Sequence, residues 1–241
     1  MKIRNLISLM SLLALSAVFT ACSDSSGPND LTMLTMEARL TEKSVSGTML
    51  DGKSAEVLGA EVDSIALDRV RVLVSRLKLK AKGSDDSTSA GDVDVKTGPM
   101  VIDADADTIR IFAIGEIPAG NYDQVKFEFH RFDGSQIADY LNDSIFGAFV
   151  TDDRWTVLVD GVAYEDGEEL PFTYRSDITA NLSLKFPEQI EVQEGDAVTV
   201  VLEIDPLEIF SQGGGILDPR DGTNESKIDN GIKSAIKALK K

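Results

Sequence analysis

Apolar and polar residues alternate with a period of two along most of the chain as far as residue 204. The clearest run lies at residues 125–129, where Val125, Phe127 and Phe129 alternate with charged residues. Successive side chains of a strand point to opposite faces, so this alternation indicates strands with one buried face. Nine strands are expected, at residues 36–40, 65–79, 100–104, 109–114, 125–129, 155–159, 170–174, 180–186 and 198–204.

Turn signals separate these runs, among them Pro118-Ala119-Gly120-Asn121 and the hairpin signal Asp166-Gly167. About nine short strands divided by turns predict an all-β fold, an antiparallel β-sandwich of the immunoglobulin or prealbumin-like kind. A short helix is expected near residues 136–141, inside a longer connection.

The longest run, residues 65–79, changes its apolar parity twice, near Asp68-Arg69 and near Ser75-Arg76. A one-residue slip turns every following side chain to the other face of a sheet. One extra residue at each place would restore a single buried face, so we predict β-bulges there.

The end of the chain has a helical period instead. Between Ser226 and Lys241, apolar residues recur at helical spacing and lysines gather near the end, where positive charge complements the helix dipole. This predicts a C-terminal amphipathic helix packed on the sandwich. Gly231 inside it costs about 1 kcal/mol relative to Ala, so packing must support the helix.

The first residues have the composition of a secretory signal. Lys2 and Arg4 precede an apolar run that is shorter than the ~20 residues needed to span a bilayer, and Ala21 is a small residue before Cys22. The polar stretch after Cys22 has the Gly, Pro and Ser content of a flexible linker. We expect a signal peptide at 1–21, a tether at 22–30, a β-sandwich domain at 31–210 and an acidic loop with the final helix at 211–241.

Thr20, Ala21 and Cys22 resemble the lipobox of bacterial lipoproteins. This resemblance implies that Cys22 carries a thioether-linked diacylglycerol and an N-acyl chain such as palmitate. One acyl chain binds a membrane only marginally, whereas several together give a stable anchor. The expected location is the bacterial cell envelope, lipid-anchored in the outer membrane and facing either the periplasm or the cell surface.

Composition limits the partners. The whole chain has a formal net charge of −17, and removal of Lys2 and Arg4 with the leader would leave 22 Lys+Arg against 41 Asp+Glu, a net charge of −19. Such a charge repels phosphate backbones, so no nucleic-acid binding is expected. Cys22 is the single cysteine, which leaves no intrachain disulfide, thiolate metal site or cysteine nucleophile.

Beyond the lipobox, several further segments carry a family resemblance: Pro118-Ala119-Gly120-Asn121-Tyr122, Val125-Lys126-Phe127, Phe172-Thr173-Tyr174-Arg175-Ser176-Asp177, Leu217-Asp218-Pro219, Asn224, Ile228-Asp229, Ile232-Lys233 and Ile236. With these segments, the chain resembles a family of β-sandwich lipoproteins of Gram-negative bacteria, of the domain of unknown function 4382 type, over roughly residues 60–241. The resemblance implies the sandwich fold and no established activity or catalytic residue.

Candidate metal ligands gather before the final helix, where Asp218, Asp221, Asn224 and Asp229 surround a Gly-containing loop. Calcium takes six to eight oxygen ligands of this kind. The competing interpretation is ordinary turn and helix-cap chemistry, with Asn224 or Ser226 as the cap. No other cofactor is expected. The acidic run at residues 103–107 has the spacing of an EF-hand start, but it also fits the solvent face of a strand.

No catalytic set stands out. His130 is the single histidine and falls on the face opposite Phe127 and Phe129, as a surface residue would. The single tryptophan, Trp155, shares parity with Val157 and is expected on the buried face, which counts against a sugar-binding surface.

We therefore expect a non-enzymatic envelope lipoprotein with a binding or structural role. Its partners would be the membrane, through Cys22, and an envelope protein or glycan. The alternatives are a carbohydrate-binding module, a calcium-stabilised adhesion module, an acidic-site hydrolase, and a subunit of a larger envelope assembly.

Overall fold

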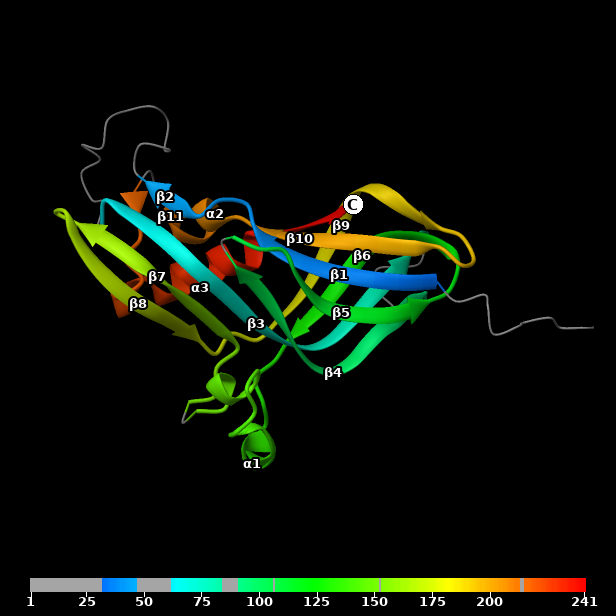
Figure 1. Cartoon of the computed structure of the whole chain (residues 1–241), viewed down its shortest axis with the longest axis horizontal. Helices are drawn as coiled ribbons and strands as arrows, with labels where there is room; N and C mark the ends of the chain where they lie inside the picture. The colour runs from blue at the N-terminus through cyan, green and yellow to red at the C-terminus, as the bar shows by residue number, and fades with distance from the viewer. Residues whose placement is uncertain (1–31, 47–61, 84–90, 106, 152, 213–214) are drawn as a thin grey trace, which may run out of the picture.

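Two β-sheets packed face to face form the body of the protein in this computed structural model (Figure 1). The structure describes residues 32–46, 62–83, 91–105, 107–151, 153–212 and 215–241. The fold class is the predicted all-β sandwich.

The smaller sheet has the strand order β13-β10-β1-β5. Its strands are β1 (Thr32–Leu40), β5 (Arg110–Ile117), β10 (Ala197–Ile204) and β13 (Ile236–Lys240). β1 and β10 run parallel, while the other pairs are antiparallel, so the purely antiparallel prediction was wrong at this pair.

The larger sheet is built around β3 (Ser64–Ala81), which pairs along both edges. β7 (Val157–Glu165) and then β6 (Gly120–Phe129) pair with one edge, and β2 (Ser44–Ser46) and then β4 (Asp92–Asp105) pair with the other. The outer strands are β8 (Glu168–Ser176), beside β7, and β9 (Ala180–Val192), beside β6.

The nine long strands from β1 to β10, leaving out β2, match the nine runs expected from the sequence. The predicted bulges in β3 are also confirmed. The register shifts between Leu67 and Arg69 against β7, and between Val74 and Arg76 against β4 and β6. Each shift returns the apolar residues of β3 to one face, so that Ile65, Val70 and Leu77 are all buried in the main core.

The C-terminal segment differs from the prediction. Helix α3 (Glu225–Ser234) follows a short helix η4 (Gly222–Asn224) and ends seven residues before Lys241. Residues 236–240 form β13, which pairs with β10. Ile236 and Ala238 are buried while Lys237 between them is exposed, a period of two that the longer helical pattern hid. The open edge of β10 also supplies backbone partners that a surface helix would leave unused.

Helix α3 packs on the main core through Ile228 and Ile232. It also lies against α2 (Pro206–Phe210), and the short pair β11 (Ser211–Gln212) and β12 (Gly215–Ile216) follows α2. The predicted segment 211–241 is therefore part of the sandwich, since it supplies both a packed helix and a sheet strand.

Tyr174 of β8 connects the large sheet to α3. Its hydroxyl donates a hydrogen bond to Asp229 Oδ1 at 2.7 Å and lies 3.2 Å from the Glu225 carbonyl oxygen. Burial, followed by the contact with Asp229, raises the pKa of Tyr174 well above its ordinary value of 10.0. The neutral phenol is thus the form that the folded state favours.

This shift predicts a loss of stability in alkali. An acid with a raised folded-state pKa contributes stability that is fully present below the unfolded-state pKa, about 10, and is lost as the pH rises above it. In urea unfolding at about pH 8 and about pH 11, we expect Tyr174→Phe to lose about 1 kcal/mol at the lower pH. Between the two pH values, the free energy of unfolding should fall less in Tyr174→Phe than in the wild type. An equal loss would contradict the role assigned to Tyr174.

No helix among the described residues is long and apolar enough to cross a membrane.

Candidate functional site

The outer face of the large sheet carries arginines in two neighbouring rows. In the first row, Arg71 of β3 lies between Asp103 of β4 and Leu158 of β7, and Leu158 is followed by Arg175 of β8. In the second row, Arg69 lies between Asp105 and Asp160, and Asp160 is followed by Thr173. Val70 and Val72 of β3 alternate with these arginines and point into the core. The bulge at residues 67–69 therefore sets the face on which Arg69 and Arg71 lie.

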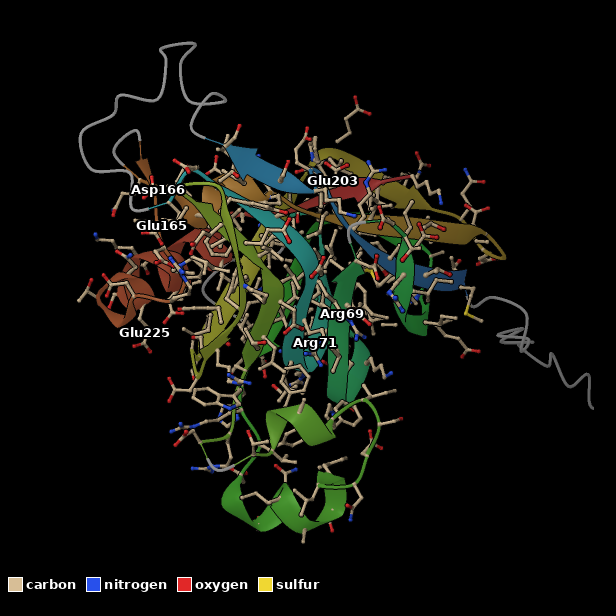
Figure 2. All side chains as sticks on the ribbon, turned by 60° about the vertical axis from the view of Figure 1, so that its left-hand side comes forward. Arg69, Arg71, Glu165, Asp166, Glu203 and Glu225 are labelled. Carbon is tan, nitrogen blue, oxygen red and sulfur yellow. The ribbon has the colours of Figure 1, made fainter. Side chains whose placement is uncertain are left out.

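The connection between β6 and β7 covers part of this face. It contains η2 (Gly134–Gln136), α1 (Ile137–Tyr140) and η3 (Gly147–Phe149), in the region where a short helix was predicted. Phe132, Phe149 and Val150 of the connection bury Leu73 and Leu158 of the sheet in a second, smaller core. In Figure 2, Arg69 and Arg71 lie on the sheet just above this connection.

Three aromatic rings stiffen the connection. The ring centroids of Phe132 and Tyr140 are 4.5 Å apart, and that of Phe146 lies 5.7 Å from the first and 5.2 Å from the second. The two contacts of Phe146 are edge-to-face, a favourable geometry for aromatic pairs. The connection is thus held on the sheet by side-chain packing, and its borders with the arginine rows form two pockets.

The first pocket, which we call the arginine pocket, has a volume of about 470 Å³. Its charged lining consists of Arg69, Arg71, Lys96, Arg110 and Asp103, four positive groups against one carboxylate. Its rim includes Ile111 of β5 and Ile145 of the connection, each 58% exposed. In a chain with a net charge of −17, this lining has the opposite sign and lies next to exposed apolar surface. Asp105 and Asp160, which do not line the pocket, pair with Arg110 and Arg71.

The second pocket, which we call the tryptophan pocket, has a volume of about 450 Å³ and shares Arg71 with the first. Two arginines and two aspartates balance each other in its lining. Half-buried Trp155, the hydroxyls of Thr151 and Thr173, Ala148 and Leu158 complete it. The charged lining residues are Arg71, Arg175, Asp153 and Asp160.

Ion pairs hold the arginines in place. Arg69 binds Asp103 with two hydrogen bonds, from Nε at 2.7 Å and from Nη2 at 2.5 Å, and this contact raises the pKa of Arg69. Arg110 Nη2 lies 2.8 Å from Asp105 Oδ2. The backbone N–H of Asp107, followed by Arg110, lowers the pKa of Asp105. These shifts favour the charged forms of Arg69 and Asp105 at neutral pH.

Arg71 is the group common to both pockets. Its Nη2 donates to Asp160 Oδ2 at 2.9 Å, and Asp160 Oδ1 accepts from the Thr173 hydroxyl at 2.8 Å. Its Nε–H is buried without a hydrogen-bond partner among the described residues. Lys96 and Arg175 form no ion pair within the described part of the chain. Lys96 therefore remains available to an external anion in the arginine pocket, whereas Arg175 lines the tryptophan pocket and not the arginine pocket.

The four calcium candidates each have protein partners. Asp218 pairs with Arg220 at 2.7 Å, and Asp221 accepts from the Thr223 backbone N–H at 2.8 Å. The Asn224 amide donates to the Asp218 carbonyl oxygen at 3.2 Å, and Asp229 accepts from the Tyr174 hydroxyl. Among the described residues, no group of three or more His, Cys, Asp or Glu lies close enough together to hold a metal ion.

These contacts fit the turn-and-cap interpretation, and Asn224 occupies the N-cap position of α3, one of the two positions predicted. Asp221 caps η4, which leads into α3, whereas Asn224 makes no side-chain cap hydrogen bond. Asn224 is fully buried, and its side chain serves the loop instead.

We expect calcium to leave the melting temperature of the protein unchanged. Binding to the folded state alone would raise it by mass action, but the carboxylates of this loop already have protein partners. Thermal unfolding in calcium and in EDTA provides the measurement. A rise that disappears in Asp221→Asn would show that the loop does hold the metal.

The other candidates from the sequence have surface roles. The acidic run of β4 forms ion pairs, as the solvent face of a strand would: Asp103 with Arg69, and Asp105 with Arg110. His130 is exposed. Cys22, the expected lipidation site, lies outside the described residues, as does the leader.

Trp155 does not lie where the sequence placed it. It precedes β7, its backbone N–H bonds to the Phe149 carbonyl oxygen at 3.0 Å, and its side chain packs against the second core. The left-handed backbone of Arg154, with φ 56°, comes directly before it. Trp155 therefore belongs to the connection, and period-two parity does not apply to it.

The fold and the pockets define a class: a β-sandwich domain with a basic, partly apolar pocket on the outer face of its larger sheet. No protein-family model matches the sequence, and no curated protein matches it. The solved structure of MbnP from Methylosinus trichosporium is similar to this chain, with a TM-score of 0.45 and 9% sequence identity. That similarity covers 87% of this chain and 99% of the MbnP chain.

Proposed function

We propose that this protein is a lipid-anchored binding protein of the bacterial envelope, without catalytic activity, whose arginine pocket binds an anionic ligand. The observation that carries the proposal is the set of four cations in one pocket of an acidic protein. Arginine guanidinium groups match carboxylates and phosphates in geometry and keep their charge at any physiological pH. Because Lys96 forms no ion pair in the described part of the chain, a bound anion need not displace a protein carboxylate there.

The geometry also supports a binding role over chemistry. The arginine pocket is lined by guanidinium and ammonium groups, one carboxylate and apolar side chains, with Ser144 as its hydroxyl. This lining supplies charge and shape and does not place a nucleophile beside a base. The strand pattern and turn motifs further support membership of the β-sandwich lipoprotein family that the sequence resembles.

The test of binding is calorimetric titration of the full-length protein, in neutral detergent, with malonate and with inorganic phosphate at low salt. Heat of binding that falls with added salt is expected, because salt screens charged contacts. The absence of binding by either anion would remove the proposed function of this pocket.

The envelope location rests on Cys22 and has its own test. We expect the first peptide of the mature protein to begin at Cys22 and to carry the mass of a diacylglycerol and an N-acyl chain. Mass spectrometry of protein from its native membranes measures this. A mature chain that begins elsewhere, or has an unmodified thiol, would contradict lipid anchoring and leave the pocket unaffected.

A further inference from the structure

The tryptophan pocket combines groups that the arginine pocket lacks. Part of the Trp155 side chain packs on the second core and part remains accessible to the pocket. Around it lie donors and acceptors of both signs, with no excess charge: Arg71 and Arg175 against Asp153 and Asp160. A partly exposed aromatic ring with polar side chains around it suits a ligand that is apolar on its ring faces and rich in hydroxyl groups at its edge.

A sugar ring has this chemistry. Its C–H faces pack against an aromatic side chain, and its hydroxyls both donate and accept hydrogen bonds. Carboxylates accept from such hydroxyls, and guanidinium groups donate to them. Exposed Thr173 and Arg175 lie two residues apart on the same face of β8, along the border of the pocket, so these groups are within reach of solvent.

The two pockets are adjacent because Arg71 lines both. A ligand that spans them would place its acid group among Arg69, Lys96 and Arg110 and its ring beside Trp155. We propose that the ligand is an acidic oligosaccharide, with a uronic-acid carboxylate in the arginine pocket and a neighbouring sugar ring in the tryptophan pocket. This inference rests on the proposed anion-binding function and names the class of its ligand.

Trp155 is the only tryptophan in the sequence, so intrinsic fluorescence reports on the tryptophan pocket without any substitution. The experiment titrates the full-length protein with trigalacturonate, with the neutral trisaccharide galactotriose and with malonate, recording heat and tryptophan fluorescence together. We expect trigalacturonate to bind at least about ten-fold more tightly than malonate, or about 1.4 kcal/mol, and to change the fluorescence. Malonate should bind without changing it.

Two variants separate the pockets. Arg175→Gln removes an exposed group of the tryptophan pocket. It should weaken the binding of trigalacturonate about ten-fold and leave the affinity for malonate unchanged. Trp155→Leu should have the same selective effect, and circular dichroism of this variant checks that the connection still folds. Because Arg175 is exposed, its variant remains informative even where loss of the indole disturbs the second core.

The outcomes distinguish this inference from the function on which it rests. Equal binding of trigalacturonate and malonate, with constant fluorescence, would overturn the saccharide assignment and leave anion binding intact. Binding of galactotriose as tight as that of trigalacturonate would overturn the requirement for an acid group. If neither malonate nor trigalacturonate bound, both the inference and the proposed function would fail.

Discussion

Replacing Lys96 and Arg110 together by Gln is expected to weaken malonate binding at least about 100-fold. Each hydrogen bond to a charged group contributes about 1.5–3 kcal/mol, and 1.4 kcal/mol is a ten-fold change in affinity. These two cations are the appropriate targets because their loss disturbs the fold least. Arg110 is exposed, and Lys96 forms no ion pair in the described part of the chain.

Arg69 and Arg71 are poorer targets. Arg69 binds Asp103 with two hydrogen bonds, and the Arg71 side chain is only 18% exposed and lines both pockets. Removal of either arginine would therefore mix an effect on stability with the effect on binding. Arg110 is more exposed, and its partner Asp105 keeps the hydrogen bond from the Asp107 backbone N–H. Calorimetric titration of the double variant and the wild type at matched low salt gives the ratio of affinities.

The matched control is the double variant Arg39→Gln, Lys43→Gln. It removes the same net charge at residues that do not line the arginine pocket, where Arg39 pairs with Glu203 and Lys43 with Asp107. A general electrostatic effect would weaken the binding of malonate equally in both double variants. Equal loss would mean that the net charge of the protein, and not the pocket, attracts the anion.

Replacing Gly231 by Ala is expected to destabilise the protein by about 1–3 kcal/mol, although helix propensity alone favours Ala by about 1 kcal/mol. A Cβ at this position would lie 2.5 Å from the Ile209 carbonyl oxygen and 2.8 Å from that of Glu208. Both atoms are backbone of α2, so relief of the clash requires the two helices to separate. Separation would in turn loosen Ile228 and Ile232 in the main core.

Thermal or urea unfolding measures this loss. Gly222→Ala is the control, because a Cβ there meets nothing within 4 Å and its change should stay within about 0.5 kcal/mol. A Gly231→Ala variant as stable as the wild type would show that the α2–α3 contact can relax at little cost.

Much of the sheet architecture could be predicted because its signal is local. A strand that buries one face must alternate apolar and polar residues. In β3 even the two bulges are visible in the sequence, as changes of apolar parity at Asp68-Arg69 and Ser75-Arg76. The C-terminal strand β13 escaped prediction because Ile236 and Leu239 also fit a helical face. The free edge of β10, distant in sequence, decided between the two.

The candidate site was not visible in the sequence. Arg69 and Arg71 alternate with valines, as any solvent-facing residues of β3 would, and Lys96, Arg110 and Arg175 come from three other strands. No spacing links these positions. A parity argument also misplaced Trp155, because the strand had not yet begun at that residue.

The sequence by itself determined the all-β class, the long strands, the bulges of β3 and the acidity of the chain, because these depend on neighbouring residues and on composition. Only the tertiary structure decided which strands became neighbours, where the β6–β7 connection folded back, and which charges met at its borders. Packing between distant segments brings together arginines that are far apart along the chain. The arginine pocket and the tryptophan pocket therefore exist only in the folded protein.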